Sequence, residues 1–440
     1  MKWSLKQYAQ ILSLPIANLG NEIIQNVAFD SRQVTSGSLF FALSGEKVDG
    51  HQFLEFAAQK GAIAAIVSNQ YIGESYGLTL LPVSDPLLAL ALLAKAKLEE
   101  INPIVIGITG SVGKTTTKEF AKTILQSKYR VAAPAGNSNT KISLPTFILN
   151  CNEPCEIMIL EMGATHAGDI DYLLNIAPLD YSILTNISKS HVSSFGGVRQ
   201  VAREKSKILS GPKLKGGIVC ESVLNFFDVC DLGLTTYAIE SPATTVSLLP
   251  GSKGEFQLRE KQNFSHPFTL PISASQHLEN FTAVVALALK LNMSFNEIID
   301  AAQNLKPFAH RFQTFEKGGS TYIDDSYNAS VTSFLSAFES LPKPKGGKRI
   351  GVFGAMRELG EFSKEAHAIV AKEALEIFDE VHCIGDECRA IVDLFSLNGK
   401  SAKLYKQKEE LEKQMKISKG DLVLIKGSNS FKLWEILEKL

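Results

Sequence analysis

Short apolar runs alternate with stretches of helical periodicity along most of the chain. Between residues 104 and 308 the apolar runs are short enough for buried strands, and the alternation is typical of a mostly parallel sheet wrapped by helices. The runs predicted as strands are Ile104–Ile108, Glu156–Leu160, Tyr181–Thr185 and Gly217–Cys220. The pattern therefore predicts an α/β fold whose central sheet carries helices on both faces.

The same pattern restarts near residue 310 and predicts a second, smaller α/β unit of the Rossmann-like kind. The first hundred residues mix short strands and helices, and a charged stretch before Pro103 closes a helix. A chain of 440 residues is long enough for two or three domains. We expect three, at residues 1–98, 99–308 and 309–440. The C-terminal strands are predicted at Thr321–Ile323, Arg349–Phe353, Glu380–Ile384 and Asp421–Ile425.

Composition excludes several classes of function. Lys and Arg number 45 against 46 Asp and Glu, so the net charge of -1 gives no global attraction to nucleic acid or anionic membrane. No apolar run reaches the roughly 18 residues of a membrane span, and the N-terminus has no signal-peptide pattern. The six cysteines show no repeated C-x-x-C spacing. We expect a reduced, cytoplasmic protein without membrane insertion.

One cysteine cluster could be drawn as a metal site. His382 and Cys383 are followed by Cys388, but no second pair of ligands accompanies them. Buried thiols next to a strand are the more common explanation of such a cluster. We therefore favour a structural interpretation of these three residues.

The strongest local motif lies directly after the strand at Ile104–Ile108, in the segment Thr109-Gly-Ser-Val-Gly-Lys-Thr-Thr116. Its glycines let backbone N–H groups turn toward phosphate, Lys114 can reach the β- and γ-phosphates, and the Thr115 hydroxyl can bind Mg²⁺. The general pattern G-x-x-x-x-G-K-[ST] is incomplete, because Ile108 stands at its first position. The motif predicts a bound nucleoside triphosphate, and its spacing alone leaves the family open. The predicted nucleotide contacts are Gly110, Ser111, Val112, Gly113, Lys114, Thr115 and Thr116.

Polar residues follow two further strands of the predicted sheet. Glu161 and Asn186 come directly after strand-like runs, so they are expected on the same rim as Lys114. Glu161 can supply a carboxylate to Mg²⁺. His191 follows the second of these strands. Taken alone it fits an ordinary loop histidine, whereas beside the phosphate loop and Glu161 it fits a ligand of a second ion.

Together, these motifs resemble a known family. Thr109–Thr116, Glu161-Met-Gly163, Thr185-Asn186 with His191, and His277-Leu-Glu-Asn280 are similar to the Mur ligases, the ATP-dependent amide ligases that build the peptidoglycan precursor. The resemblance runs in order over nearly the whole chain and implies a shortened glycine loop, which accounts for Ile108. It also implies that a substrate carboxylate attacks the γ-phosphate of ATP, and that an amine then attacks the resulting acyl phosphate.

The C-terminal motifs resemble one branch of the family. Asp324-Asp-Ser-Tyr-Asn-Ala329, Gly354-Ala-Met-Arg-Glu-Leu-Gly360 with His367, and Lys426-Gly-Ser428 look like the member that adds a dipeptide. The implied substrates are UDP-N-acetylmuramoyl-tripeptide and D-alanyl-D-alanine, and the implied form is a monomer. Two enzyme alternatives are a sister ligase that adds a single amino acid and a folate polyglutamate ligase. A P-loop nucleotide switch is the alternative outside enzymes.

The resemblance also implies roles for residues that no local pattern would identify. Lys205 would be carbamylated and would help to hold a second Mg²⁺; without the resemblance it would be a solvated helix lysine in the charged run Arg203–Lys207. The implied catalytic residues are Lys114, Lys205 and His191, and the implied metal ligands are Thr115, Glu161, His191 and Lys205. His277 and Asn280 would lie at the adenine, Arg311 and Asp325 at phosphate and ribose, Ser31, Arg32, Asp49 and His51 at the uridine diphosphate, and Tyr327 and Asn328 at the dipeptide.

A few positions depart from the family's usual residues. Thr140 and Ser143 replace asparagine and glycine, Ser188 replaces glycine, Lys207 replaces an acidic residue, and Ala355 replaces aspartate. The phosphate and metal residues are intact, so we expect an active enzyme.

Overall fold

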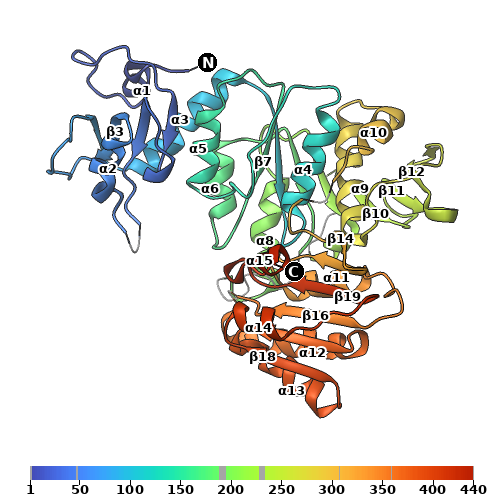
Figure 1. Ribbon diagram of the computed structural model, residues 1–440. Helices are drawn as coiled ribbons and strands as arrows, with labels where there is room; N and C mark the ends of the chain where they lie inside the picture. Colours follow the sequence, from blue (N-terminus) through green and yellow to red (C-terminus); the bar gives the residue numbers. More distant parts are fainter. Residues whose placement is uncertain are drawn as a thin grey trace.

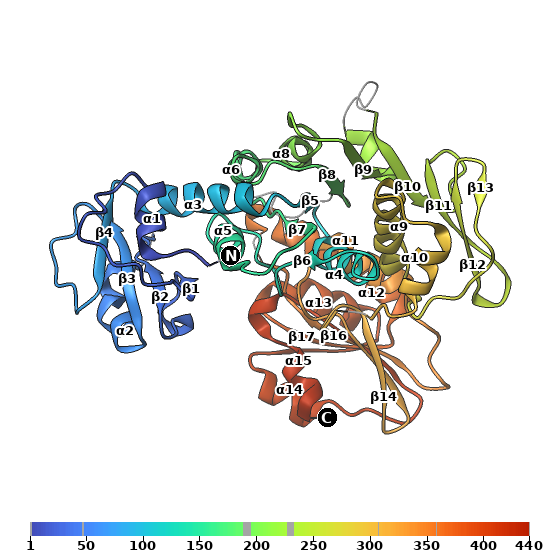
Figure 2. The same ribbon diagram turned by 90° about the horizontal axis from the view of Figure 1, so that it is seen from above.

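The chain forms three β-sheets, each with its own helices, in the computed structural model shown in Figures 1 and 2. The structure describes residues 2–45, 48–187, 195–226, 233–306, 308–357 and 359–439. The N-terminal sheet projects to one side, while the C-terminal sheet lies against the central part of the molecule (Figure 1). The two parts are in contact where the Ser275 N–H donates to Ser340 Oγ at 3.2 Å.

The N-terminal sheet has four parallel strands in the order β1-β2-β3-β4. Its first helix starts with a capping box, in which the Ser4 side chain accepts from the Gln7 N–H and Gln7 accepts from the Ser4 N–H. The strands are Asn26–Ala28, Ser38–Phe41, Ala62–Ser68 and Thr79–Val83; the helices are α1 Leu5–Ile11 and α2 Leu54–Gln59, with the short 3₁₀ helices η1 Ser31–Gln33 and η2 Gly50–Phe53.

A long helix and one side chain join this unit to the centre. Helix α3, Pro86–Ile101, begins at the Asp85 cap, whose carboxylate accepts from the N–H groups of Leu87 and Leu88. Asn150 meets the backbone of Val27 twice, donating to its carbonyl at 2.9 Å and accepting from its N–H at 2.8 Å. Figure 2 shows α3 spanning the gap between the two sheets.

The central sheet has nine strands in the order β13-β12-β11-β10-β9-β8-β5-β7-β6. It is parallel from β11 to β6, and only the β12 and β13 edge is antiparallel. Helices α4, α9 and α10 lie on one face and α5 and α6 on the other (Figure 2). The strands β5 to β13 are Ile104–Thr109, Val131–Ala132, Ile157–Glu161, Tyr181–Leu184, Gly216–Cys220, Thr235–Ile239, Val246–Pro250, Phe256–Glu260 and Asn263–Phe264; the helices are α4 Lys114–Leu125, α5 Ser143–Asn150, α6 Asp169–Ile176, α8 Val198–Ser206, α9 Ser275–Lys290 and α10 Phe295–Ala302.

The C-terminal sheet has six strands in the order β14-β15-β19-β16-β17-β18, and only β14 is antiparallel. Separate apolar clusters fill its two faces, one under α11, α12 and α13 and one under α14 and α15. The strands are Gln313–Lys317, Ser320–Asp324, Arg349–Gly354, Glu380–Ile384, Ser401–Tyr405 and Leu422–Lys426; the helices are α11 Val331–Glu339, α12 Ser363–Ile377, α13 Arg389–Leu397, α14 Lys408–Gln414 and α15 Trp434–Lys439.

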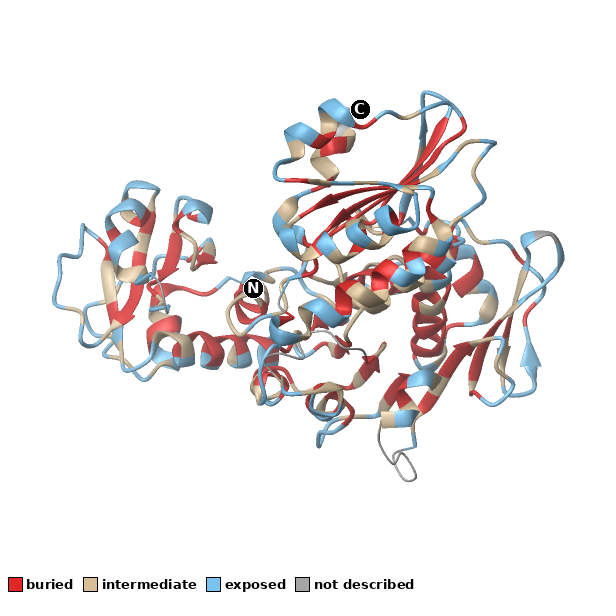
Figure 3. Ribbon diagram, turned by 90° about the horizontal axis from the view of Figure 1, so that it is seen from below, coloured by how far each residue is buried: buried red, intermediate tan, exposed pale blue. Residues whose placement is uncertain are grey.

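These sheets confirm the predicted α/β fold with a mostly parallel central sheet and a second α/β unit. Each predicted strand is present to within one or two residues. The buried strands are red in Figure 3 and lie in the middle of each layer. The domain limits at residues 98 and 308 stay predictions, since the apolar core of the centre also includes Leu90 and Leu93 of α3.

The structure also bears on the cysteine cluster and on the search for a membrane span. Cys383 lies inside β17 and Cys388 beside it, both fully buried, which agrees with structural thiols. Among the described helices, none is both long and apolar enough to cross a bilayer.

Candidate active site

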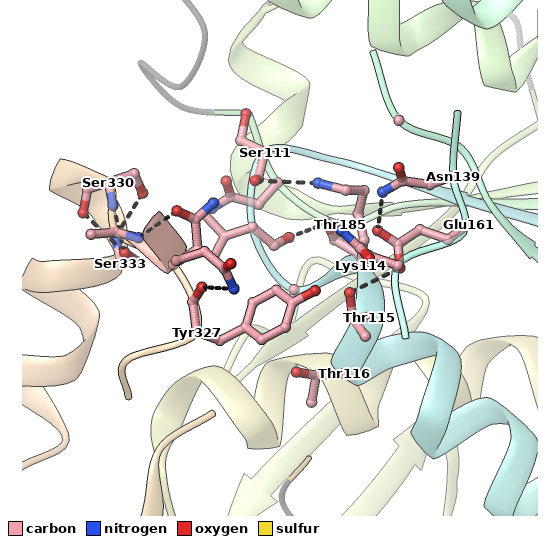
Figure 4. A pocket seen from close by; sticks show the side chains of 18 of the residues that line it. Ser111, Lys114, Thr115, Thr116, Asn139, Glu161, Thr185, Tyr327, Ser330 and Ser333 are labelled. Carbon is pink, nitrogen blue, oxygen red and sulfur yellow. Dashed lines mark hydrogen bonds between the residues drawn. The ribbon is translucent and has the colours of Figure 1, made fainter. Parts of the chain in front are cut away.

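A cavity of about 790 Å³ lies between the central sheet and the C-terminal unit. Its central wall carries the phosphate loop and Glu161, and its C-terminal wall carries Arg311 and Tyr327. Figure 4 shows Lys114, Thr115 and Glu161 on one side of this space and Ser330 and Ser333 on the other. Most residues predicted to bind nucleotide thus line one cavity, although up to about 200 positions separate them in the chain.

The phosphate loop connects β5 to the N-terminus of α4. Gly113 has φ +86°, in the left-handed region that favours glycine, and a Cβ there would collide with Asn280 Oδ1. A Cβ on Gly110 would collide with Thr185 Oγ1. The loop can therefore pack this closely only because both positions are glycine, which keeps its N–H groups and the helix N-terminus turned toward a bound anion.

Lys114 is the first residue of α4 and extends back over the loop. Its Nζ donates to the Gly110 carbonyl at 2.9 Å, and burial lowers its pKa although Glu161 nearby opposes this. An ammonium held against a carbonyl in a partly buried site is poised to exchange that contact for a phosphate oxygen, which is a stronger, charge-assisted partner.

Thr115 and Glu161, two of the predicted metal ligands, contact each other beside the phosphate loop. Thr115 Oγ1 donates to Glu161 Oε2 at 2.8 Å, and Asn139 Nδ2 donates to Glu161 Oε1 at 2.7 Å. Glu161 is only 1% exposed, so its charge has little screening by water. A hydroxyl and a carboxylate beside the phosphate loop suit Mg²⁺, which also takes water and phosphate oxygens as ligands. No three His, Cys, Asp or Glu side chains gather into a metal cluster within the described ranges. His191 and Ser188 lie outside those ranges.

Lys205 lies near the end of α8 and is 1% exposed. The interpretation as a solvated helix lysine is therefore wrong: one face of α8 packs inward, and Lys205 lines the cavity. Burial, reinforced by the positive charge of Lys114, lowers the pKa of Lys205 to about 7. A buried ammonium this close to another cation is costly, so the neutral amine or an anionic derivative fits the site better. Lys207 points elsewhere, pairing with Asp171 at 2.5 Å.

The opposite wall presents Arg311 from the segment that enters the C-terminal unit. Its guanidinium carbon lies 4.0 Å from the centre of the Tyr327 ring, and its Nε has no hydrogen-bond partner among the described residues. Burial lowers the pKa of Arg311. A half-buried guanidinium with an unused donor, facing the phosphate loop across the cavity, suits an anionic ligand.

Further predicted residues hold the two walls together. His277 packs edge-on to Phe312 with ring centres 6.2 Å apart, and burial lowers its pKa to about 4, so the ring is neutral at pH 7. Thr117 Oγ1 donates to Asn280 Oδ1 at 3.2 Å, which ties α4 to α9. Asn328 lines the cavity beside Tyr327.

The sequence assigned no role to several residues that line the cavity, although Thr185 and Lys426 belong to its motifs. Asn139 Nδ2 donates to Glu161, Thr185 Oγ1 donates to the Val112 carbonyl of the phosphate loop, and Lys426 pairs with Asp325. Asn139 sits in the same polar loop as the unusual Thr140 and Ser143, whose hydroxyls hydrogen-bond to each other at 2.9 Å. The polar composition of that loop could have indicated Asn139 as a site residue. Nothing local in the sequence indicates that Thr185 contacts the glycine loop.

Family models cover almost the whole chain. Residues 23–98 match the Mur ligase family catalytic domain, 108–288 the Mur ligase middle domain, and 310–429 the Mur ligase glutamate ligase domain. A UDP-N-acetylmuramoyl-tripeptide--D-alanyl-D-alanine ligase of Bacillus subtilis is 31% identical over 100% of this chain and 98% of its own. The chain belongs to the Mur ligase family.

Solved structures of Mur ligases agree with this assignment. The Acinetobacter baumannii MurF has a TM-score of 0.85 at 25% identity, over 100% of this chain and 99% of its own. The Thermotoga maritima MurF ligase in complex with ADP has a TM-score of 0.80 at 29% identity, over 94% and 96% of the two chains. The fold and the resemblance predicted from the sequence are thereby confirmed.

The Mur ligase fold leaves the predicted uridine contacts outside this cavity, on the N-terminal unit. Asp30 caps η1 and binds the Arg32 side chain at 2.6 Å, while the Ser31 residue is buried. His51 Nδ1 pairs with Asp49 at 2.6 Å and His51 Nε2 accepts from the Ser68 N–H, so Asp49 and His51 already hold local structure. Arg32, with 84% of its side chain exposed, is the freest of the four predicted contacts.

Proposed function

We propose that this chain is the ATP-dependent ligase that joins D-alanyl-D-alanine to UDP-N-acetylmuramoyl-tripeptide, forming UDP-muramoyl-pentapeptide, ADP and phosphate. The observation that carries the proposal is the single cavity in which Lys114, Thr115 and Glu161 face Arg311 and the C-terminal wall. Full-length relatives carrying the name of this ligase support the choice of substrates.

The residues explain how such a site would activate a carboxylate. Lys114 and the loop N–H groups would hold the β- and γ-phosphates, and Arg311 would neutralise charge from the opposite side. The tripeptide carboxylate would attack the γ-phosphorus, ADP would leave, and the dipeptide amine would then displace phosphate from the acyl carbon. Positioning and charge neutralisation do this work, so no protein nucleophile is needed.

Mg²⁺ bound at Thr115 and Glu161 would neutralise phosphate charge. We propose a second ion near Lys205 and His191, with Lys205 carrying a carbamate. Support comes from the burial of Lys205 and its lowered pKa of about 7, because only a neutral amine reacts with CO₂. Carbamylation would replace the positive charge of Lys205, close to Lys114, with a negative charge, and a negative charge attracts a metal cation.

The remaining predicted roles extend the proposal to both substrates. His277 and Asn280 would lie at the adenine and Asp325 at the ribose, and Tyr327 and Asn328 would meet the dipeptide. Arg32, Ser31, Asp49 and His51 would bind the uridine diphosphate on the N-terminal unit. We place the reaction in the cytoplasm, and a monomer stays a prediction.

The test is amine-dependent ADP formation in the presence of UDP-muramoyl-tripeptide. D-alanyl-D-alanine should support turnover far better than D-alanine or L-lysine, because a site built for a peptide bond and its carboxylate leaves polar groups unpaired with a single amino acid. Equal rates with all three amines would overturn the substrate assignment. ADP formation that needs no amine at all would instead favour the nucleotide switch.

A further inference from the structure

Arg357 is a cation on the C-terminal wall of the cavity, and the reaction described above gives it no role. On this wall Arg311 is half-buried, and Lys426 is fully buried and paired with Asp325. Arg357, in contrast, lines the cavity with 45% of its side chain exposed. It follows β16, so it lies at the carboxyl edge of the C-terminal sheet, where ligands of parallel sheets bind.

Arg357 rests on a platform built by two neighbouring strand ends. Its guanidinium carbon lies 4.8 Å from the centre of the Phe431 ring, and its Nη1 donates to Glu387 Oε1. Glycines allow this packing: a Cβ on Gly385 would lie 3.1 Å from Phe431 and 3.2 Å from Glu387, and one on Gly354 would lie 3.2 Å from Phe431. The guanidinium is thus held on one face by an aromatic ring and on one edge by a carboxylate.

This arrangement leaves part of the guanidinium available. A guanidinium has five N–H donors, and Glu387 takes one at Nη1. The remaining edge can form the paired hydrogen bonds that fit a carboxylate. Nearby lining residues at the end of β19 are neutral and polar, namely Ser428, Asn429 and Ser430. These residues add hydrogen-bonding groups but no charge, so Glu387 is the carboxylate with which a bound anion would share the guanidinium.

We propose that Arg357 binds the free carboxylate of the amine substrate and so selects for an acceptor that ends in a carboxylic acid. This inference rests on the proposed ligase function. The phosphates have Lys114 and Arg311, and the carboxylate of the tripeptide must lie at the phosphate loop to be phosphorylated. The carboxylate of the dipeptide is a further anion of this reaction, and Tyr327 and Asn328, proposed above to meet the dipeptide, line the same cavity as Arg357.

The experiment compares D-alanyl-D-alanine with its C-terminal amide as acceptors, measuring kcat/KM for each with saturating ATP and UDP-muramoyl-tripeptide. The wild-type enzyme should prefer the acid about 10- to 100-fold, the usual size of a charge-assisted hydrogen-bond pair. Arg357→Met should lose that factor with the acid and keep kcat/KM for the amide within about twofold. Arg357→Lys should fall between the two, because it keeps the charge and loses the paired geometry.

Arg389→Met is the matched control, since Arg389 is an exposed residue close to Glu387 that does not line the cavity. It should keep the full acid preference. An unchanged ratio of acid to amide in Arg357→Met would overturn the inference, as would a rise in KM for ATP or for the muramoyl substrate instead. If Arg357→Met does not fold, an Arg357→Lys enzyme with the wild-type ratio overturns it equally. Failure of the wild-type enzyme to use the dipeptide would refute the proposed function itself, which separates the two results.

Discussion

Lys426 Nζ lies 2.5 Å from Asp325 Oδ2, and the two side chains are only 1% and 8% exposed. Burial raises the pKa of Asp325 and lowers that of Lys426, so each charge depends on the other to stay buried. The pair joins β15 to β19 at the edge where the cavity opens.

Removing one member of this pair should be worse than removing both. Asp325→Asn leaves an unpaired buried ammonium and should lower the free energy of unfolding by about 3–5 kcal/mol. The double variant Asp325→Asn with Lys426→Met leaves no lone charge and should recover part of that loss. Urea unfolding of the two single variants and the double variant measures this. Additive losses would show that the pair is not coupled.

Gly113 of the phosphate loop and Gly168, which precedes α6, allow the cost of backbone strain to be distinguished from the cost of a steric collision. Both have φ near +90°, but a Cβ on Gly113 would hit Asn280 whereas one on Gly168 would meet nothing within 4 Å. Each alanine variant should pay the strain of the left-handed conformation, about 1 kcal/mol. Only Gly113→Ala should also lose nucleotide binding, measured by titration with ATP. Similar losses of affinity in both variants would contradict the packing argument.

Lys114→Ala should abolish ligation while the protein stays folded. Lys114 contributes mainly charge to the phosphates, and losing such a group costs on the order of a thousand-fold in rate. The variant should unfold at about the wild-type temperature, because the hydrogen bonds that Lys114 Nζ makes to described residues go to the loop carbonyls of Gly110 and Ser111. Near-normal ligation by a folded Lys114→Ala protein would refute the assignment of the phosphate loop.

Lys205 gives a prediction that depends on pH. Its pKa of about 7 means that the amine is mostly protonated at pH 6 and mostly neutral at pH 8. Carbamate formation consumes the neutral amine and CO₂ and releases a proton, so bicarbonate should restore a CO₂-depleted enzyme well at pH 8 and poorly at pH 6. Activity independent of CO₂ at both values would count against the carbamate.

A variant tests the same residue in another way. Lys205→Ala should be severely impaired and partly rescued by small carboxylic acids, because a diffusible anion can take the place of the carbamate. Lys205→Arg should resist rescue, since it keeps a positive charge in the site. Full activity of both variants would remove Lys205 from the metal site.

Local patterns were enough to predict the strands and the phosphate loop. The strand Ile104–Thr109 and the glycine turn after it are encoded by adjacent residues, so their period and composition suffice. The rule that ligands lie at the carboxyl ends of parallel strands placed Glu161 beside Lys114 correctly. Family resemblance was needed for Lys205, whose burial depends on how α8 packs against the rest of the centre.

Contacts between distant side chains could not be predicted in this way. Asp325 and Lys426 are 101 positions apart and meet only because β15 and β19 become neighbours in the sheet. The fit of Asn280 against Gly113 likewise requires α9 to pack beside α4. Strand order and helix packing determine which side chains meet, and neither can be inferred from the hydrophobic periodicity of a single segment.

The two walls of the cavity belong to separately built sheets, each with its own apolar core. The phosphate loop lies on one wall, and Arg311 and Arg357 lie on the other. A change of acceptor therefore requires new residues at the carboxyl edge of the C-terminal sheet, whereas the phosphate loop on the central sheet can stay the same. An enzyme built in this way can acquire a new acceptor through substitutions in its C-terminal unit alone.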